Sequence, residues 1–343
     1  MMSGVQSLEA RPLAASVDEL LALAERREPF VNPDGRSASA FERLWIDGRP
    51  HIVKYAHLDD DFTMRVSGDL VCRPVRAWAA GLLDAAPALV DHTVVGAALG
   101  CGRNGWGAAL LMRDVSDELV ALGSVPFTAD EHDLLIDHLA GWCAATWAFR
   151  DDPVVGPHLL PYWFRWTFFG PATLDGERAL GWPERVPAIA AEGWERFRDR
   201  APRDVAGVID ELWHDITPLA DAIRPTPSCL LHGDAKASNM GIAADGRMVL
   251  IDWAYVGEGP ACHELCWHLA LDREKLPVTK EATIAAFRQG LERYGVDTAG
   301  WWERQLGLCL LGALVQFGWE KAYGDDAELG WWCDAAREGV RFL

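Results

Sequence analysis

Two short segments of this chain carry polar side chains of the kinds that transfer a phosphoryl group. Residues 230–239 read LLHGDAKASN and residues 249–253 read VLIDW, so in each case an apolar stretch leads into polar residues. Phosphoryl transfer needs a carboxylate to orient the attacking hydroxyl, and hard oxygen ligands to hold Mg²⁺ against the phosphates. Asp234 suits the first role, and Asn239 and Asp252 suit the second. The alternative is a strand–turn–strand unit with solvated polar tips.

The same residues resemble two motifs of the aminoglycoside phosphotransferase family. His232-Gly233-Asp234 with Asn239 resembles its catalytic loop, and Ile251-Asp252-Trp253 resembles its metal-binding segment. The catalytic lobes of that family are relatives of the eukaryotic protein kinases. The resemblance extends over about residues 30–320 and implies an α+β, bilobal protein-kinase-like fold. That fold has a small antiparallel β-sheet lobe and a larger, mainly helical lobe.

The resemblance also implies roles for individual residues. Asp234 would be the catalytic base, Asn239 and Asp252 would be the Mg²⁺ ligands, and ATP or GTP would donate the phosphate. We expect His232 to hold the loop in shape by hydrogen bonds, because a lone histidine is usually structural. Lys236 departs from what is common in the family and gives the pattern D-x-K-x-x-N of Ser/Thr protein kinases. There the resemblance implies a catalytic lysine at the γ-phosphate, and the alternative is a solvated surface lysine.

Nucleotide-binding residues are expected in the first part of the chain. Lys54, in Ile-Val-Lys-Tyr, looks like the kinase strand lysine that pairs with the α- and β-phosphates, although it could instead point outward from an edge strand. Residues 34–39 would form the loop that covers the phosphates, where small side chains let backbone N–H groups approach phosphate oxygens. That assignment rests on position alone, because the loop lacks G-x-G-x-x-G. We expect the nucleotide to contact Gly35, Ser37, Ser39, Met112 and Asp114.

Two features of this first part need a separate interpretation. The kinase glutamate that pairs with the strand lysine has no counterpart in residues 73–78, and Asp69 is the nearest acid upstream. The partner of Lys54 is therefore left open between Asp69 and a different arrangement. Residues 100–105 do spell G-x-G-x-x-G, but they come after Lys54 and no helical pattern follows. We interpret them as a hairpin loop, because a dinucleotide fingerprint requires a strand, a turn and a helix.

The surrounding elements predict how these residues are positioned. Ser16 and Glu19 form a capping-box pattern for a helix through about Arg27, and Asp47-Gly48 favours a tight hairpin turn. We expect strands at residues 41–46, 49–55, 94–98 and 107–112, with a helix at 73–83. The boundary near residue 113 divides a nucleotide-binding lobe (1–113) from a catalytic and acceptor-binding lobe (114–343). In the second lobe, strands at 229–231, 240–242 and 248–251 interrupt helices at 129–149, 187–199, 203–223, 260–271, 279–294, 299–322 and 326–341.

Two groups of residues in the second lobe admit a functional and a structural interpretation. Cys262, His263, Cys266 and His268 lie within one helix, where four ligands cannot converge on zinc, so we expect a buried helix face. Glu264 in that helix lies where relatives carry an acid that braces the catalytic loop. The chain has 17 tryptophans, which can fill a core or stack on a sugar or base. Residues 150–186 lie where relatives place acceptor-contacting helices, and we expect them to form a wall of the acceptor site.

Composition restricts the partners. The net charge is −19; residues 1–113 contribute −2 (12 Lys and Arg, 14 Asp and Glu) and residues 114–343 contribute −17 (20 and 37). Such a field repels nucleic acid and anionic lipid and attracts cations, although it also serves solubility. No apolar run reaches about 20 residues, which excludes a membrane span. With no export signal and eight scattered cysteines, we expect a cytoplasmic protein.

These observations predict a Mg²⁺-dependent kinase that phosphorylates a hydroxyl of a small natural product, with ATP or GTP as donor. An antibiotic is the favoured acceptor, which would confer resistance. The acidic second lobe favours a cationic aminoglycoside, whereas the aromatic content favours a nucleoside antibiotic. Alternatives are a metabolic kinase for an amino sugar or amino alcohol, and a non-catalytic binding module. A protein kinase fits less well, because little chain separates Asp252 from the helix at 260.

Overall fold

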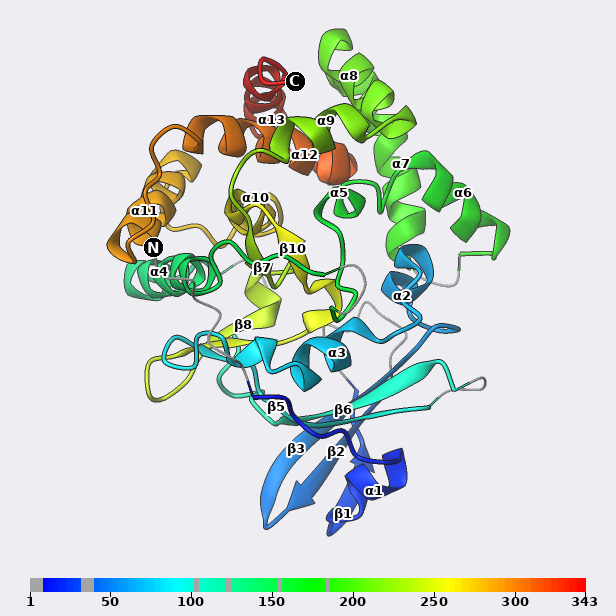
Figure 1. Ribbon diagram of the computed structural model, residues 1–343. Helices are drawn as coiled ribbons and strands as arrows, with labels where there is room; N and C mark the ends of the chain where they lie inside the picture. Colours follow the sequence, from blue (N-terminus) through cyan, green and yellow to red (C-terminus); the bar gives the residue numbers. More distant parts are fainter. Residues whose placement is uncertain (1–8, 32–39, 102–104, 121–124, 153–155, 183–184) are drawn as a thin grey trace.

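The computed structural model describes residues 9–31, 40–101, 105–120, 125–152, 156–182 and 185–343. It has a small lobe built on a β-sheet and a larger lobe built of helices, as expected (Figure 1). The sheet is antiparallel throughout and has the order β1-β2-β3-β6-β5. Its strands are β1 (Arg26–Pro29), β2 (Ala40–Ile46), β3 (Arg49–His57), β5 (Val94–Leu99) and β6 (Gly107–Arg113). β5 and β6 pair antiparallel on either side of the G-x-G-x-x-G sequence, and no helix follows it; residues 102–104 of that sequence lie outside the described residues.

The Asp47-Gly48 turn forms as predicted. Both residues have positive φ, 48° and 68°, which a two-residue hairpin turn of the favoured type requires. The turn sets the register of β2 against β3, in which Ile46 faces Arg49 and Phe41 faces Lys54. The hairpin therefore places Lys54 in the middle of the sheet, between β2 and β6.

The predicted first helix is too long. α1 spans only Val17–Leu21, although Ser16 caps it as predicted by accepting from the backbone N–H of Glu19 at 3.1 Å. The prediction that it continues to Arg27 is wrong, because Arg26–Pro29 pairs with β2 as an edge strand. Cross-strand contacts explain the change: Arg27 donates to Glu42 at 2.8 Å, and the Arg26 guanidinium lies 3.5 Å from the ring centre of Trp45.

Two short helices, α2 (Phe62–Ser67) and α3 (Arg73–Ala79), lie between the sheet and the larger lobe (Figure 1). The sequence did not predict α2, whose N-cap is Asp61. The predicted helix 73–83 is shorter than expected, because Gly81 adopts φ 73° and the short helix η1 (Leu82–Asp84) follows. Both α2 and α3 contact residues 253–255 of the larger lobe, which follow Asp252 in the chain.

The larger lobe contains the predicted helices with three changes. The helix predicted at 129–149 ends at Ala145, where the Thr146 hydroxyl donates to the carbonyl of Trp142. The helix predicted at 203–223 is two helices, because Asp215 is extended and Pro218 starts a new one. Two further short helices, α5 and α6, lie within residues 150–186, where the resemblance implies helices although the residue pattern predicted none. The helices are α4 (Ala129–Ala145), α5 (Tyr162–Arg165), α6 (Pro171–Ala179), α7 (Arg185–Arg200), α8 (Arg203–His214), α9 (Thr217–Ile223), α10 (Ala261–Leu271), α11 (Lys280–Arg293), α12 (Trp302–Lys321) and α13 (Asp326–Val340).

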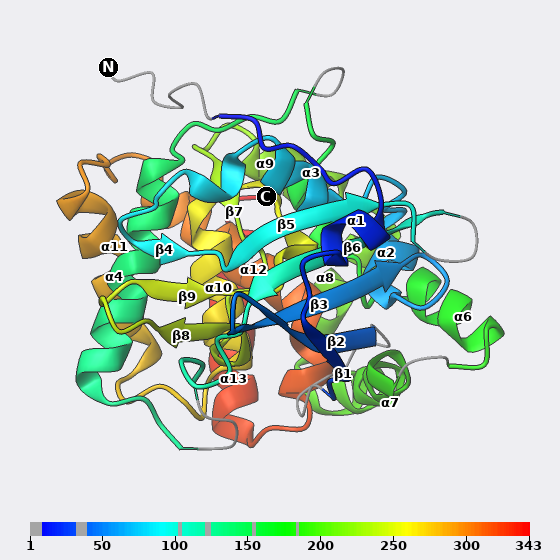
Figure 2. The ribbon, with the colours of Figure 1, turned by 90° about the horizontal axis from the view of Figure 1, so that it is seen from below.

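Short strands interrupt these helices where the sequence predicted them. β8 (Met240–Ile242) pairs with β9 (Met248–Leu250), and β9 also pairs in parallel with β4 (Val90–Asp91). β7 (Cys229–Leu231) pairs with β10 (Gly257–Gly259), a strand that the sequence did not predict. In Figure 2, the three-stranded sheet lies beside the five-stranded one. The turns η2 (Ala237–Asn239) and η3 (Trp253–Tyr255) lie between these strands.

The core is continuous beneath these strands. The first ten residues of α10 are all buried, as is most of α12, and α10 packs on both α12 and β7. All eight cysteines are free thiols, and only Cys101 is partly exposed. No helix among the described residues is long and apolar enough to cross a membrane. The five-stranded sheet ends at Arg113, and the division of the chain at that residue stays a prediction.

Candidate active site

The loop after β7 is held in a shape that only glycine permits at residue 233. Gly233 has φ 82°, and a Cβ there would lie 2.4 Å from Nη1 of Arg165 and 2.5 Å from the carbonyl of Tyr255. The backbone N–H of Gly233 donates to Oε1 of Glu264 at 2.9 Å. The structure therefore places Glu264 against the loop, where the resemblance implies a bracing acid. Burial raises the pKa of Glu264 to about 7.

His232 connects the loop to the second motif. Its Nε2 donates to the carbonyl of Ile251 at 2.9 Å, and its Nδ1 accepts from the backbone N–H of Asp234 at 3.2 Å. An imidazole that donates through one nitrogen and accepts through the other is neutral. Burial agrees with that state, since it lowers the pKa of His232 to about 3. His232 thus joins the two segments by hydrogen bonds. Because both of its ring nitrogens are bonded to the backbone, it has no nitrogen available for proton transfer.

Asp234 is buried and bonded through both carboxylate oxygens. Oδ2 accepts from Nζ of Lys236 at 2.8 Å and from Nδ2 of Asn239 at 2.8 Å. Oδ1 accepts from the indole N–H of Trp267 at 2.9 Å. Burial raises the pKa of Asp234 and the charge of Asp252 raises it further, whereas Lys236 opposes the shift. The carboxyl is therefore fixed in direction and better able to hold a proton than an exposed aspartate.

Lys54 and Asp252 meet across the two lobes. Nζ of Lys54 lies 2.8 Å from Oδ1 of Asp252 in a pair that joins β3 to the end of β9. Burial opposes ionisation of Asp252, but the charge of Lys54 prevails and lowers the pKa of this carboxyl to about 2. Asp252 has φ 62°, a left-handed conformation that costs an L-residue about 1–2 kcal/mol. Asp252 makes its ion pair with Lys54 from this backbone conformation.

Asp69 does not pair with Lys54. Its carboxylate instead accepts from the backbone N–H of Arg73, at 3.0 and 3.2 Å, and so caps the start of α3. The second acid that acts on Lys54 is Asp61, whose charge follows that of Asp252 in raising the pKa of the lysine. Nothing in the sequence singles out Asp61, because it precedes a helix that was not predicted.

The atoms left over in this cluster suit a hard cation. Nδ2 of Asn239 bonds to the carbonyl of Asp234 at 3.0 Å as well as to its carboxylate, and carbonyl oxygens only accept. The amide orientation is therefore fixed, and its Oδ1 is the atom directed elsewhere. Asp252 uses Oδ1 for Lys54, which leaves Oδ2 as a further oxygen ligand. An amide oxygen and a carboxylate oxygen fit Mg²⁺, which takes one or two protein ligands alongside phosphates.

A pocket between the lobes adjoins this cluster. Lys54, Asp61, Met112 and Asp252 line it, and its other walls are mostly apolar: Ala56, Met64, Val75, Leu83, Val94, Ala108, Leu110 and Trp253 are among them. Asp114 is not among the lining residues; its carboxylate lies 2.8 Å from the guanidinium of Arg43. Gly35, Ser37 and Ser39 fall outside the described residues, so the expected phosphate loop has no structural account here.

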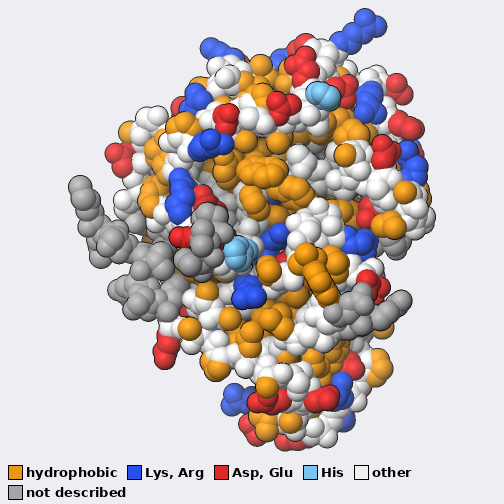
Figure 3. All heavy atoms as spheres, turned by 45° about the vertical axis from the view of Figure 1, so that its right-hand side comes forward, with side chains coloured by type: hydrophobic (Ala, Val, Ile, Leu, Met, Phe, Trp, Pro, Cys, Tyr) orange, Lys and Arg blue, Asp and Glu red, His pale blue; other side chains and the backbone are white. Residues whose placement is uncertain are grey.

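The aromatic segment after α4, residues 162–169 with the sequence YWFRWTFF, mainly fills the core. Trp166 and Phe168 are buried, and the ring of Phe168 lies 5.1 Å from that of Tyr255, whereas Trp163 is 40% exposed. The guanidinium of Arg165 is wholly buried and donates to the carbonyls of Tyr255 and Leu160. In Figure 3, hydrophobic side chains gather at the centre of the face shown, with Lys and Arg side chains around them.

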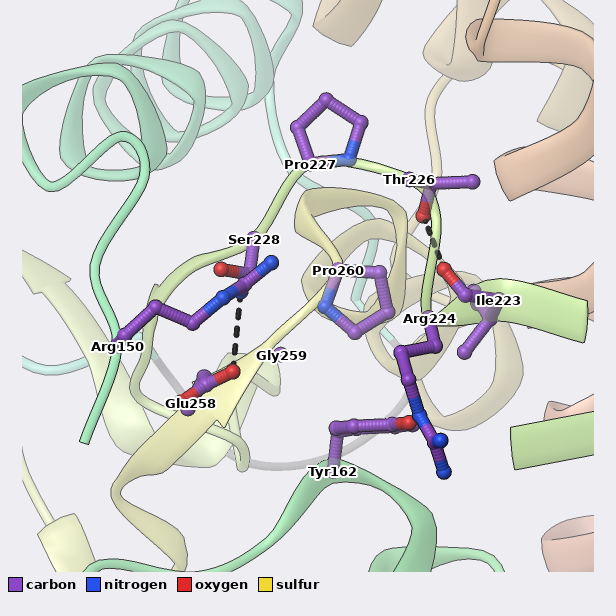
Figure 4. Close-up of a pocket in the computed structure, with 10 residues that line it drawn as sticks. All are labelled: Arg150, Tyr162, Ile223, Arg224, Thr226, Pro227, Ser228, Glu258, Gly259 and Pro260. Atoms are coloured by element: carbon purple, nitrogen blue, oxygen red, sulfur yellow. Dashed lines mark hydrogen bonds and ion pairs between the residues drawn. The ribbon is translucent and has the colours of Figure 1, made fainter. Parts of the chain in front are cut away.

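A second pocket lies at the other end of β7 and β10 from Asp234, because Ser228 precedes β7 and Pro260 follows its antiparallel partner. Figure 4 shows Arg150 reaching Glu258 on one side, at 3.0 Å, with Tyr162 and Arg224 on the other. Tyr162 is the member of the aromatic segment that faces this pocket. The predicted acceptor wall and the catalytic loop are thus connected through α5, which carries both Tyr162 and Arg165.

The cysteine and histidine side chains of α10 are buried in the core of the larger lobe. Among the described residues, no group of three or more His, Cys, Asp or Glu side chains could hold a metal ion. His268 lies 2.8 Å from the carboxylate of Asp272, which in turn accepts from the backbone N–H of Ala237 in the loop. Asp272 and Trp267 contact the loop directly. Neither stood out in the sequence, because both contacts join segments that are distant along the chain.

Comparisons with known proteins agree with this geometry. The sequence profile of the phosphotransferase enzyme family matches residues 75–297, which is more than half of the chain. No curated protein sequence matches. A microcompartment-associated aminopropanol kinase has a similar structure, with 12% identity, a TM-score of 0.53, and coverage of 95% of this chain and 98% of that one. At this identity the likeness shows the kinase fold alone.

Two other solved structures are similar over comparable lengths. The choline kinase LicA from Streptococcus pneumoniae has 13% identity and a TM-score of 0.50, over 95% of this chain and 98% of that one. The amicoumacin kinase hAmiN, in complex with AMP-PNP, Ca²⁺ and Ami, has 12% identity and a TM-score of 0.50, over 95% and 92%. The two-lobed kinase fold predicted from the sequence is confirmed.

Proposed function

This chain belongs to the phosphotransferase enzyme family, and we propose that it is a kinase that transfers the γ-phosphate of ATP or GTP to a hydroxyl of a small molecule. The observation that carries the proposal is the convergence of Asp234, Asn239, Asp252 and Lys54 beside a pocket between the lobes. A binding module without catalysis would not need a base, two metal ligands and a phosphate-binding lysine together.

Each side chain has a role in this reaction. Asp234 accepts the hydrogen bond of the acceptor hydroxyl and takes its proton as the hydroxyl oxygen bonds to the γ-phosphorus. The bond from that phosphorus to the β–γ bridging oxygen breaks in the same transfer and releases ADP or GDP. Lys236 lies 2.8 Å from that carboxylate, so its ammonium is placed to offset the negative charge that builds up on the transferring group. Lys54 leaves its ion pair with Asp252 and binds the α- and β-phosphates. The charge of Asp61 helps to keep the ammonium of Lys54 protonated in the buried site.

Mg²⁺ fits the oxygen atoms that remain. Oδ1 of Asn239 and Oδ2 of Asp252 would hold the ion, and bound Mg²⁺ neutralises the phosphate oxygens of the donor. Before nucleotide binds, the charge of Lys54 outweighs burial and lowers the pKa of Asp252 to about 2, so the carboxylate that would receive Mg²⁺ is ionised. The two ligands provide a site that phosphates complete, so metal and nucleotide should bind together.

The acceptor is proposed to be a small natural product, with an antibiotic favoured. The similarity to an amicoumacin kinase supports an antibiotic acceptor and a role in resistance, whereas the similarity to choline and aminopropanol kinases supports a metabolic amino alcohol. The net charge of −17 on residues 114–343 favours a cationic acceptor in either case.

A turnover panel tests the proposal. ADP or GDP release is measured with aminoglycosides, nucleoside antibiotics, choline, amino alcohols and amino sugars, with D234N as the control for contaminating kinases. We expect turnover with at least one amine-bearing acceptor, and a fall in kcat/KM as ionic strength rises from about 0.01 to 0.15 M, because screening shortens the reach of the acidic field. A kcat/KM that does not change with ionic strength would favour a neutral acceptor. Equal turnover by wild type and D234N would refute the proposal that this protein is a kinase.

A further inference from the structure

Trp267 contacts the proposed base directly and belongs to none of the motifs discussed above. Its indole N–H lies 2.9 Å from Oδ1 of Asp234, and the ring is 4% exposed. The side chain is held from two sides, because the ring centres of Tyr255 and Phe317 lie 5.4 and 4.9 Å away. An indole has one donor and no acceptor, so this contact can only be a hydrogen bond to the carboxylate.

The donors on Asp234 are distributed unequally between its two oxygens. Each carboxylate oxygen has about two lone-pair sites. Oδ2 accepts from both Lys236 and Asn239, which occupies both of its sites. Among the described residues, Trp267 is the one donor to Oδ1. The acceptor hydroxyl therefore meets Oδ1, at the site that Trp267 leaves open.

The helix that carries Trp267 also holds the loop on either side of Asp234. Glu264 accepts from the backbone N–H of Gly233 at 2.9 Å, and Asp272 accepts from that of Ala237 at 2.8 Å. Trp267 lies between them on α10, and all three side chains are buried. The two acids fix the backbone of the loop, whereas Trp267 acts on the carboxylate itself.

We propose that Trp267 is a positioning residue that fixes the rotation of the Asp234 carboxylate, so that Oδ1 presents a single lone pair to the acceptor hydroxyl. The inference rests on the proposed function and adds which carboxylate oxygen of Asp234 the acceptor hydroxyl binds. Without the indole N–H, the carboxylate still has Lys236 and Asn239 on Oδ2 but can rotate about the bond that carries its oxygens. Misplacement of a reacting atom by about 1 Å can cost 10²-fold in rate.

The test removes the donor and keeps the shape. Trp267 is replaced by benzothienylalanine, in which sulfur takes the place of the N–H, and in parallel by W267F. The probe is Mg·ATP with water in the acceptor's place, together with any acceptor from the panel. We expect kcat to fall about tenfold to hundredfold, the range for one hydrogen bond to a charged group, while the KM for ATP changes less than about twofold.

Trp194 provides the matched control. It is 2% exposed, and its N–H donates to the carbonyl of Phe169 at 2.7 Å from α7, a helix that packs on α6, α8 and α12. Benzothienylalanine at 194 should leave kcat unchanged. A wild-type kcat with benzothienylalanine at 267 would overturn the inference, as would equal losses at 267 and 194.

The same assay separates this inference from the proposed function. If the wild-type protein transfers phosphate and D234N does not, an unchanged kcat after replacement of Trp267 refutes only the positioning role of Trp267. If wild type transfers no phosphate from Mg·ATP to water or to any acceptor, both fail. Thermal unfolding of the benzothienylalanine protein shows whether the fold is retained. Because the isostere preserves packing and removes one buried hydrogen bond, we expect the Tm to fall by only a few degrees.

Discussion

Substitution of Gly233 by alanine should be much more damaging than an ordinary glycine substitution. The new Cβ would lie 2.4 Å from Nη1 of Arg165 and 2.5 Å from the carbonyl of Tyr255, and the first of these groups is a fully buried guanidinium. Left-handed φ costs an L-residue about 1–2 kcal/mol. Overpacking of a dense interior costs a further 1–3 kcal/mol or so, which gives a loss of about 2–5 kcal/mol for G233A.

Gly246 separates the two contributions. It has a similar φ of 86°, but a Cβ there would have no neighbour within 4 Å, so G246A should lose only the conformational part, about 1–2 kcal/mol. Urea titrations followed by far-ultraviolet circular dichroism give the free energy of unfolding of wild type and both variants. If G233A loses no more free energy than G246A, Arg165 and Tyr255 do not clamp the loop, and the reasoning is refuted.

Three further predictions concern the side chains of the site. K236A should lower kcat by about 10²–10³ with a smaller effect on nucleotide KM, because the charge of Lys236 matters most in the transition state. K236R should restore kcat only in part. A wild-type kcat in K236A would show that Lys236 is a solvated side chain. D252A should abolish Mg²⁺-dependent binding of a non-hydrolysable triphosphate in calorimetry, and unchanged affinity would exclude Asp252 as a ligand. For Glu264, burial raises the folded-state pKa to about 7, so the folded protein binds the proton more tightly than the unfolded chain. Stability should therefore fall as pH rises from about 4.5 to 7, and E264Q should flatten that slope in urea titrations; an unchanged slope would show that Glu264 does not titrate there.

The catalytic loop could be predicted from the sequence because its parts are close along the chain. Asp234 and Asn239 lie five residues apart, and one hairpin carries the chain on to Asp252. The Asp47-Gly48 turn was predictable for the same reason, since local backbone preference alone fixes it.

Contacts between distant segments could not be predicted in this way. The bond from Trp267 to Asp234 spans 33 residues, and Thr63 reaches Tyr255 across 192. Nothing in the local pattern distinguishes Trp267 from the other tryptophans. β1 was missed for a related reason, because Arg26–Pro29 favours a strand only once β2 lies beside it.

The most direct test of the proposed mechanism is the turnover of D234N beside its affinity for nucleotide. The carboxylate acts on the acceptor hydroxyl, so its loss should lower kcat by about 10²–10⁴ while Mg·nucleotide still binds, because Lys54, Asn239 and Asp252 remain. Steady-state kinetics with the best acceptor and calorimetry with a non-hydrolysable triphosphate measure the two quantities. A D234N enzyme that keeps more than about a tenth of the wild-type kcat would show that Asp234 is not the base.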